Sequence, residues 1–164
     1  MVWRPVGVGG LVALTFIAAI AQADAVVPSE VIDQSAADSM VQRCLSRSKA
    51  NAWPPFSIVV VDAAGAIILL RRQDGASAVT ADAALLKAQT AARAGAPTAA
   101  LAALSQDPAT RDLMMLLRVT SDPGGLPIKL ATHTIGAIGV SGGTAEQDAA
   151  CASAAISNSD VEKK

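Results

Sequence analysis

The sequence predicts an α+β fold in which one antiparallel sheet, made of two hairpins, is covered by helices. Two pairs of short β-branched or aliphatic runs each flank a turn, which is the pattern of a hairpin. Helical patterns precede, separate and follow these pairs, an order that suits one antiparallel sheet better than a parallel one. The chain has 164 residues, 52% hydrophobic and 16% charged, so it is long and apolar enough for one folded domain.

The first helix and the first hairpin have clear boundaries. Residues 29–49 predict a helix, since apolar side chains recur at every fourth position. Two prolines from Pro54 end it, because proline lacks an amide donor and disfavours a helical residue before it. The runs at 56–62 and 66–72 predict two strands, and the small residues at 63–65 predict the turn between them.

The middle of the chain predicts helices only. Thr80 is expected to cap a helix over 80–94, and Gly95 to end it, because glycine readily adopts the left-handed conformation of a helix end. Two shorter helices are expected over 98–105 and 108–119.

The last third predicts a second hairpin and a final helix. Residues 121–125 (SDPGG) form the clearest turn in the sequence. Strands are expected over 126–131 and 134–140, joined by a turn at Thr132 and His133. A helix over 144–158 follows, and a threonine and a glutamine at its start match a capping box.

Residues 1–25 have the pattern of a secretory signal peptide. Arg4 is the only charge before a largely apolar run over 6–20, and two small-x-small triplets at 21–25 fit a cleavage site. The run is about fifteen residues long, short for a membrane-spanning helix of about twenty. An uncleaved N-terminal anchor is the alternative. We expect a periplasmic or secreted protein with a single domain over 26–164 and no stable membrane span after cleavage.

The two cysteines, Cys44 and Cys151, leave two interpretations open. Export permits a disulfide between them, and a bridge across a loop of about a hundred residues would stabilise the fold by roughly 4–5 kcal/mol. The alternative is a pair of small buried thiols on the first and last helices. The sequence has no CxxC motif and no Cys/His pair, so neither a structural zinc site nor a thioredoxin-like dithiol is indicated.

Composition argues against nucleic acid as a partner. The formal net charge is −1, whereas binding to phosphates requires a clustered basic surface. The chain has two Trp, two Phe and no Tyr, too few aromatic rings for a base-stacking platform. Only Trp53 and Phe56 remain after signal cleavage.

His133 is the only histidine, and it lies in the expected turn of the second hairpin. A histidine in a turn is commonly a surface residue, but a neutral imidazole is also a good axial ligand for a haem or a corrinoid. Met114 and Met115 are alternative soft ligands, although core packing is their simpler role. No acid is placed to orient His133 in a catalytic triad.

A glycine-rich turn between a strand and a capped helix predicts an anion site. Gly142 and Gly143 lie in this turn, where backbone amides at a helix start can bind an anion. The segment lacks the Lys-Ser/Thr of a P-loop, and the glycines would equally serve a tight turn. Lys87 lies in an apolar helix and would either reach into a cleft or extend to water. These residues predict a site the size of an anion or a propionate group.

Four segments together carry a family resemblance. They are 58–76 (IVVVDAAGAIILLRRQDGA), 84–91 (ALLKAQTA), 124–128 (GGLPI) and 135–143 (IGAIGVSGG), the last followed by Asp148. In this order they resemble the GlcG/HbpS family, often described as haem-degrading and similar to the C-terminal domain of PduO-type cobalamin adenosyltransferases. The resemblance spans residues 29–157. It implies a profilin-like α/β/α sandwich, a homo-oligomer, and binding of haem or a related tetrapyrrole.

The resemblance also supplies the candidate site residues. The positions that fit the family pattern, expected to bind the cofactor, are Arg72, Asp74, Lys87, Gly124, Gly125, Gly142, Gly143 and Asp148. His133 stands where a glycine-bearing turn is expected and is the candidate metal ligand. With so few aromatic residues, a bound haem would lie at an exposed or inter-subunit site.

Three functions follow from these observations. The first is an exported haem- or tetrapyrrole-binding protein with a role in haem or iron handling or in redox sensing. The second is an enzyme or accessory protein acting on a small organic acid, with Gly142 and Gly143 holding a carboxylate and Lys87 or Asp148 moving a proton. The third is a non-catalytic oligomeric interaction module.

Overall fold

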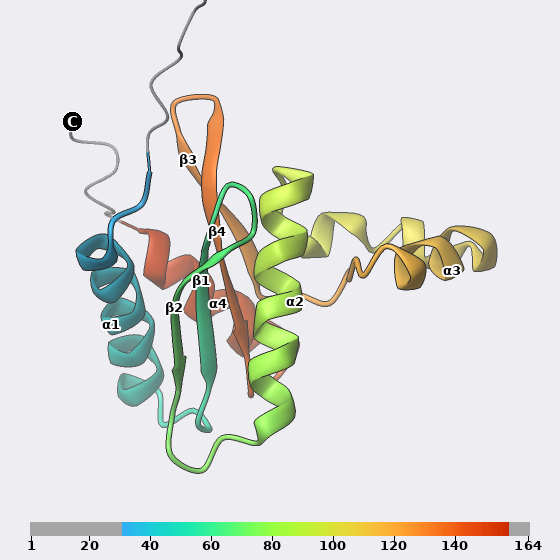
Figure 1. Ribbon diagram of the computed structural model, residues 1–164. Helices are drawn as coiled ribbons and strands as arrows, with labels where there is room; N and C mark the ends of the chain where they lie inside the picture. Colours follow the sequence, from blue (N-terminus) through green and yellow to red (C-terminus); the bar gives the residue numbers. More distant parts are fainter. Residues whose placement is uncertain (1–30, 158–164) are drawn as a thin grey trace, which may run out of the picture.

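The computed structural model describes residues 31–157, so the expected signal peptide over 1–25 lies outside the described residues. The elements, in chain order, are α1 (Gln34–Ala50), β1 (Ser57–Asp62), β2 (Ile67–Arg72), α2 (Ala78–Ala94), the 3₁₀ turns η1 (Thr98–Leu101) and η2 (Leu104–Gln106), α3 (Pro108–Leu116), β3 (Gly125–Leu130), β4 (His133–Ser141) and α4 (Ala145–Ile156) (Figure 1).

The four strands form one antiparallel sheet in the order β2-β1-β4-β3. Each predicted hairpin forms, and β1 joins them by pairing with β4 from Ser57 opposite Ser141 to Asp62 opposite Gly136. The predicted α+β fold, with one antiparallel sheet built from two hairpins, is therefore confirmed.

Helices cover both faces of this sheet. α1 and α4 pack side by side on one face, and α2 covers the other (Figure 1). Because side chains alternate along a strand, Ile58 and Val60 of β1 face α1 and α4, whereas Val59 and Val61 face α2. A continuous apolar run in β1 is thus the consequence of burial on both faces.

Two expected boundaries are corrected by the structure. His133 is the first residue of β4 rather than part of the turn, since Ala131 and Thr132 alone connect paired Leu130 and His133, with Ala131 at a φ of 51°. The second helix begins at Ala78 with an N-cap before the expected Thr80, whose hydroxyl instead contacts Ser57 at 2.7 Å.

The remaining helix boundaries shift for local reasons. The first helix begins at Gln34 because the Asp33 carboxylate accepts the amide of Ala36 and caps it there. Residues 98–105, expected as a helix, form short 3₁₀ turns. The helix expected to reach residue 119 ends at Leu116, and Arg118, two residues later, has a positive φ of 52° that no α-helix contains.

A disulfide joins Cys44 of α1 to Cys151 of α4. The two cysteines are separated by 107 positions in the sequence, and both are buried in the core between these helices and the sheet. Of the two interpretations that the sequence left open, the bridged one is correct.

The segment from η1 to α3 extends away from the sheet beyond α2, and we call residues 98–117 the arm (Figure 1). The last turn of α3 in this arm is apolar and exposed: Met115 and Leu116 are 73% and 79% accessible. Within the described residues, no helix is long and apolar enough to cross a membrane.

Candidate functional site

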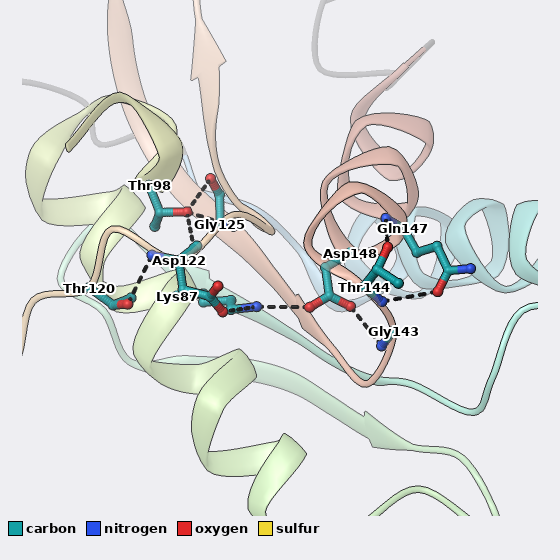
Figure 2. A network of polar contacts seen from close by, with 9 residues as sticks. All are labelled: Lys87, Thr98, Thr120, Asp122, Gly125, Gly143, Thr144, Gln147 and Asp148. Atoms are coloured by element: carbon teal, nitrogen blue, oxygen red, sulfur yellow. Dashed lines mark hydrogen bonds and ion pairs between the residues drawn. The ribbon is translucent and has the colours of Figure 1, made fainter. Parts of the chain in front are cut away.

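A buried lysine lies between two carboxylates at one end of the sheet. Lys87, on α2, is 2% exposed, and its Nζ donates a hydrogen bond to Asp148 Oδ2 at 2.8 Å (Figure 2). The same Nζ forms an ion pair with Asp122 Oδ2 at 2.6 Å. The Asp148 side chain is 4% exposed and the Asp122 side chain 59%, so the ammonium has one carboxylate on its inner side and one on its solvent side.

Two glycines allow the lysine to reach Asp148. A Cβ on Gly124 would lie 2.6 Å from the carbonyl oxygen of Val140 and 2.9 Å from Asp148 Cβ, and one on Gly125 would collide with the Lys87 carbonyl. Because these two positions carry no side chain, α2 can pack directly against the start of β3. The Lys87 side chain then reaches Asp148 of α4, the helix on the other face of the sheet. The ion pair therefore connects the helices of both faces.

Asp148 is also held by the loop before α4. The amide of Gly143 donates to Asp148 Oδ1 at 3.0 Å, and Thr144 and Gln147 form the predicted capping box (Figure 2). Burial raises the pKa of the Asp148 carboxyl above its ordinary value, and the hydrogen bonds from Lys87 and Gly143 offset this only in part. Asp148 is thus fixed in position and desolvated.

The glycine-rich turn binds the protein's own carboxylate. The amide of Gly143, which was expected to face a ligand anion, donates its hydrogen bond to Asp148 Oδ1. Gly142 takes a φ of 140°, and a Cβ there would lie 2.5 Å from the Pro55 carbonyl oxygen. The tight-turn role weighed in the sequence analysis therefore accounts for both glycines.

Hydrogen bonds hold the backbone of the loop that carries Asp122. Thr98 Oγ1 donates to the Asp122 carbonyl at 2.7 Å and accepts the Gly125 amide at 3.1 Å, and the Asp122 amide donates to Thr120 Oγ1 at 3.1 Å (Figure 2). The loop backbone is thus fastened on both sides of Asp122, while its carboxylate faces solvent.

Arg72 and Asp74 belong to a different place on the surface. They line a hollow of about 450 Å³ beside the edge strand β2, together with Leu45 of α1, Arg71 and Gln73. Arg72 donates from Nη1 to the carbonyl of Ala76 at 2.8 Å, which holds the guanidinium over the turn after β2. The predicted cofactor-binding residues therefore fall into two groups. Arg72 and Asp74 line this hollow. The others lie around Lys87, and we call Lys87, Asp122, Asp148 and the glycines at 124–125 and 142–143 the Lys87 cluster.

His133 lies apart from the Lys87 cluster. It is exposed and pairs with Leu130 beside the hairpin turn, whereas Gly139 of the same strand pairs with Gly125 near Lys87. Six residues of strand span on the order of 20 Å. No group of three metal-ligating side chains occurs in the described part of the chain, so His133 does not belong to such a group.

Asp122 was not predicted as a site residue. It lies in the SDPGG turn, where aspartate commonly serves the turn itself, so no spacing or pattern distinguished it. Only the folded chain brings it onto Lys87, 35 positions earlier in the sequence. Within the Lys87 cluster it is the carboxylate that solvent reaches most freely.

The chain is thus a layered α+β domain with a lysine packed against two glycines at one end of its sheet. Residues 32–157 match the family model described as haem degrading protein HbpS-like. Since that match covers nearly all of the described residues, the chain belongs to the HbpS-like family, as the resemblance implied.

Solved structures agree with this assignment. The Klebsiella pneumoniae protein ORFY is 30% identical with a TM-score of 0.72, over 77% of this chain and 88% of that protein. PduOC in complex with haem is 26% identical with a TM-score of 0.72, over 78% and 94% of the two chains. A double mutant of Streptomyces reticuli HbpS is 25% identical with a TM-score of 0.74, over 85% and 94%.

A curated relative also matches. An uncharacterized 15.0 kDa protein from the dhaT-dhaS intergenic region of Citrobacter freundii is 37% identical over 105 residues, which cover 62% of this chain and 74% of that protein.

Proposed function

We propose that this protein is an exported haem-binding protein that holds the propionates of haem at the hollow beside β2. The haem complex of the similar PduOC and the family description support the ligand class. The observation that carries the choice of site is that two arginines, Arg71 and Arg72, line one hollow together with an apolar side chain, Leu45.

The lining residues fit the charged edge of haem. Guanidiniums bind carboxylates with two parallel hydrogen bonds, and two arginines against the single carboxylate of Asp74 leave a net positive charge. Leu45 offers apolar contact to the ring, and a hollow of about 450 Å³ would take part of the macrocycle and leave the rest outside. When bound, haem supplies the redox chemistry of its iron; the residues of this chain bind and orient it.

A side chain that binds the haem iron would have to come from outside the hollow. The lining residues, all within the described part of the chain, include no imidazole and no thioether. His133 is exposed at the tip of the second hairpin and is thus accessible to a haem held by another copy of the chain. We propose His133 as that ligand, in keeping with an inter-subunit haem.

Titration with hemin tests the proposal. The wild-type protein is expected to shift the Soret band, and Arg71→Ala/Arg72→Ala to weaken binding about tenfold or more, since hydrogen bonds between charged groups contribute about 1.5–3 kcal/mol. Arg111→Ala/Lys129→Ala removes the same charge from exposed positions elsewhere and serves as the control. An unchanged wild-type Soret band, or equal losses in both double variants, would overturn the proposal. His133→Ala is expected to move the Soret maximum.

Export is supported by the signal-like segment over 1–25 and by the Cys44–Cys151 disulfide, because disulfides persist in oxidising compartments. A role in haem or iron handling or in redox sensing would take place there, in the periplasm or outside the cell. Mass spectrometry of the protein recovered from the periplasm is expected to give an N-terminus at Asp24 or Val26, after one of the two small-x-small triplets. A retained N-terminus in a membrane fraction would contradict export by cleavage.

Assembly into a homo-oligomer is supported by the arm. Leu104, Leu113, Met115, Leu116 and Leu117 are each about half to four-fifths exposed there. An apolar patch of several hundred Å² on a monomer commonly marks an interaction site. Leu113→Ser/Leu116→Ser is expected to convert the oligomer to monomer in sedimentation experiments, whereas Val79→Ser, an exposed apolar residue on α2, is not. A wild-type monomer at micromolar concentration would contradict assembly.

A further inference from the structure

We propose that Lys87 is a second ligand site, one that accepts a small aliphatic carboxylate in place of the Asp122 carboxylate. This site is separate from the hollow beside β2 and does not depend on haem binding. Its ligand class follows from the chemistry already present, because Asp122 presents a methylene-linked carboxylate to a buried ammonium, and acetate is the free molecule with that structure.

The two carboxylates on Lys87 differ in how firmly they are held. Asp148 is buried, and its second oxygen accepts the amide of Gly143. Asp122 is 59% exposed, and its carboxylate contacts Lys87 from the solvent side. Because water competes for an exposed carboxylate, leaving the ammonium costs Asp122 little, whereas Asp148 would lose a desolvated ion pair. Exchange is therefore confined to Asp122.

The Asp122 side chain can move away from Lys87 while the backbone of its loop stays in place. Thr98 and Thr120 hold the main chain of Asp122 through its carbonyl and its amide. Rotation of one aspartate side chain about its Cα–Cβ bond is then enough to uncover the ammonium, and the loop need not unfold. A carboxylate from solution would restore the lost ion pair at the same place, and the number of charges around Lys87 would stay the same.

A buried ammonium is unusual at a position whose only role is to stabilise the fold. Replacing a buried ion pair by apolar side chains of similar volume is often neutral or stabilising, so stability alone does not explain a lysine at this position. The glycine pair at 124–125 lets the chain pack directly against Lys87 and Asp148, where a Cβ would collide with its neighbours. Together these features favour a short ligand, such as acetate or propionate, over a bulky acid.

Asp122 would then act as a tethered competitor. A tethered group has a high effective concentration at its target, in the millimolar range or above, so the wild-type protein would bind acetate weakly. Removal of the tethered carboxylate should reveal the affinity of the site itself. This predicts that Asp122→Ala binds formate and acetate at least tenfold more tightly than the wild-type chain.

The experiment measures acetate binding to the full mature protein by thermal shift and by NMR of protein grown with ¹³C-labelled lysine, against chloride at equal ionic strength. Asp122→Ala is expected to bind at least tenfold more tightly than wild type, with a shift of the Lys87 signal. Asp112→Ala, which removes an exposed carboxylate from α3, is the matched control and should behave as wild type.

Two further results decide the proposal. Lys87→Met in the Asp122→Ala background should abolish the acetate effect; if that variant does not fold, the Lys87 signal in Asp122→Ala alone must move with acetate. Acetate binding in Asp122→Ala no tighter than in wild type, or a Lys87 signal unmoved by acetate, would overturn the proposal. Hemin binding by Arg71→Ala/Arg72→Ala is independent of both results, so this site and the haem site can fail separately.

Discussion

The two faces of the sheet are packed by different kinds of side chain. Toward α1 and α4 the core consists of large groups, among them Met40, Phe56 and Ile138, together with the disulfide. Toward α2 it consists of valines of β1 and a series of alanines, among them Ala84 and Ala88. The first face is stabilised by buried apolar volume and a covalent link, and the second by a close approach of helix to sheet.

The difference explains where the polar chemistry lies. Small residues let α2 come near enough to the sheet that its backbone excludes any side chain at Gly139. The same approach brings Lys87 to the sheet end, where it meets Asp148 from the opposite face. The face with large side chains provides rigidity, and the face with small ones positions a charged group.

Removal of the disulfide should have the largest effect on the α1–α4 face. With 107 positions between the cysteines, Cys44→Ser/Cys151→Ser is expected to lower the free energy of unfolding by about 4–5 kcal/mol. Urea unfolding monitored by circular dichroism measures it. Ser46→Ala/Ser153→Ala, exposed positions on the same two helices, should change little. A loss below about 1 kcal/mol would mean that packing alone holds this face.

On the α2 side, Lys87→Met should destabilise the protein by about 3 kcal/mol, because it leaves the buried Asp148 carboxyl without its ammonium. In Lys87→Met/Asp148→Leu no charge stays buried, so much of that loss should be recovered. Urea unfolding of both variants measures the coupling. If the double variant is less stable than Lys87→Met, the pair contributes net stability and the functional reason for its presence is weakened.

Two neighbouring residues of β4 compare the faces directly. Gly139→Ala adds one methyl group where α2 contacts the strand, and we expect a loss of about 2 kcal/mol through overpacking. Ile138→Val removes one methylene from the other face and should cost about 1 kcal/mol. Thermal unfolding of the two single variants measures both. A smaller loss for Gly139→Ala than for Ile138→Val would contradict the close approach of α2.

The smallest expected effect is on the pH dependence of stability. Since burial raises the pKa of Asp148 above 3.8, the folded chain holds this proton more tightly than the unfolded chain. The contribution of Asp148 to stability is therefore greatest below pH 3.8 and declines as the pH rises through the raised pKa. Asp148→Asn lacks this decline, so the stability of wild type relative to the variant should fall with rising pH in urea titrations. A relative rise would show that Lys87 dominates over burial.

Local signals in the sequence predicted most of the secondary structure. Apolar runs flanking small turn residues predicted both hairpins, because strand pairing across a short turn is local. Helix ends were predicted less well: Thr80 was expected to cap α2, but the helix begins two residues earlier. The Thr80 hydroxyl donates to the Ser77 carbonyl at 2.6 Å and contacts Ser57, 23 positions away, and the second of these partners cannot be assigned from neighbours alone.

The candidate site was predicted only in part. Lys87, Asp148 and the glycines around them were expected together, and they lie together; Arg72 and Asp74 form a separate hollow. Asp122 gave no signal, since its contact with Lys87 depends on how the loop after the arm returns to the sheet. The roles of all these residues in ligand binding stay predictions until the titrations are made.

By itself the sequence determined the order of elements, the α+β class and the family, because these depend on periodicity, turn chemistry and motifs that lie within short segments. Tertiary structure alone decided that Cys44 and Cys151 are bridged and that Asp122 covers Lys87. Both contacts join positions far apart in the chain, and such distances are fixed by packing: large side chains set the spacing of α1 and α4, and glycines and alanines set that of α2.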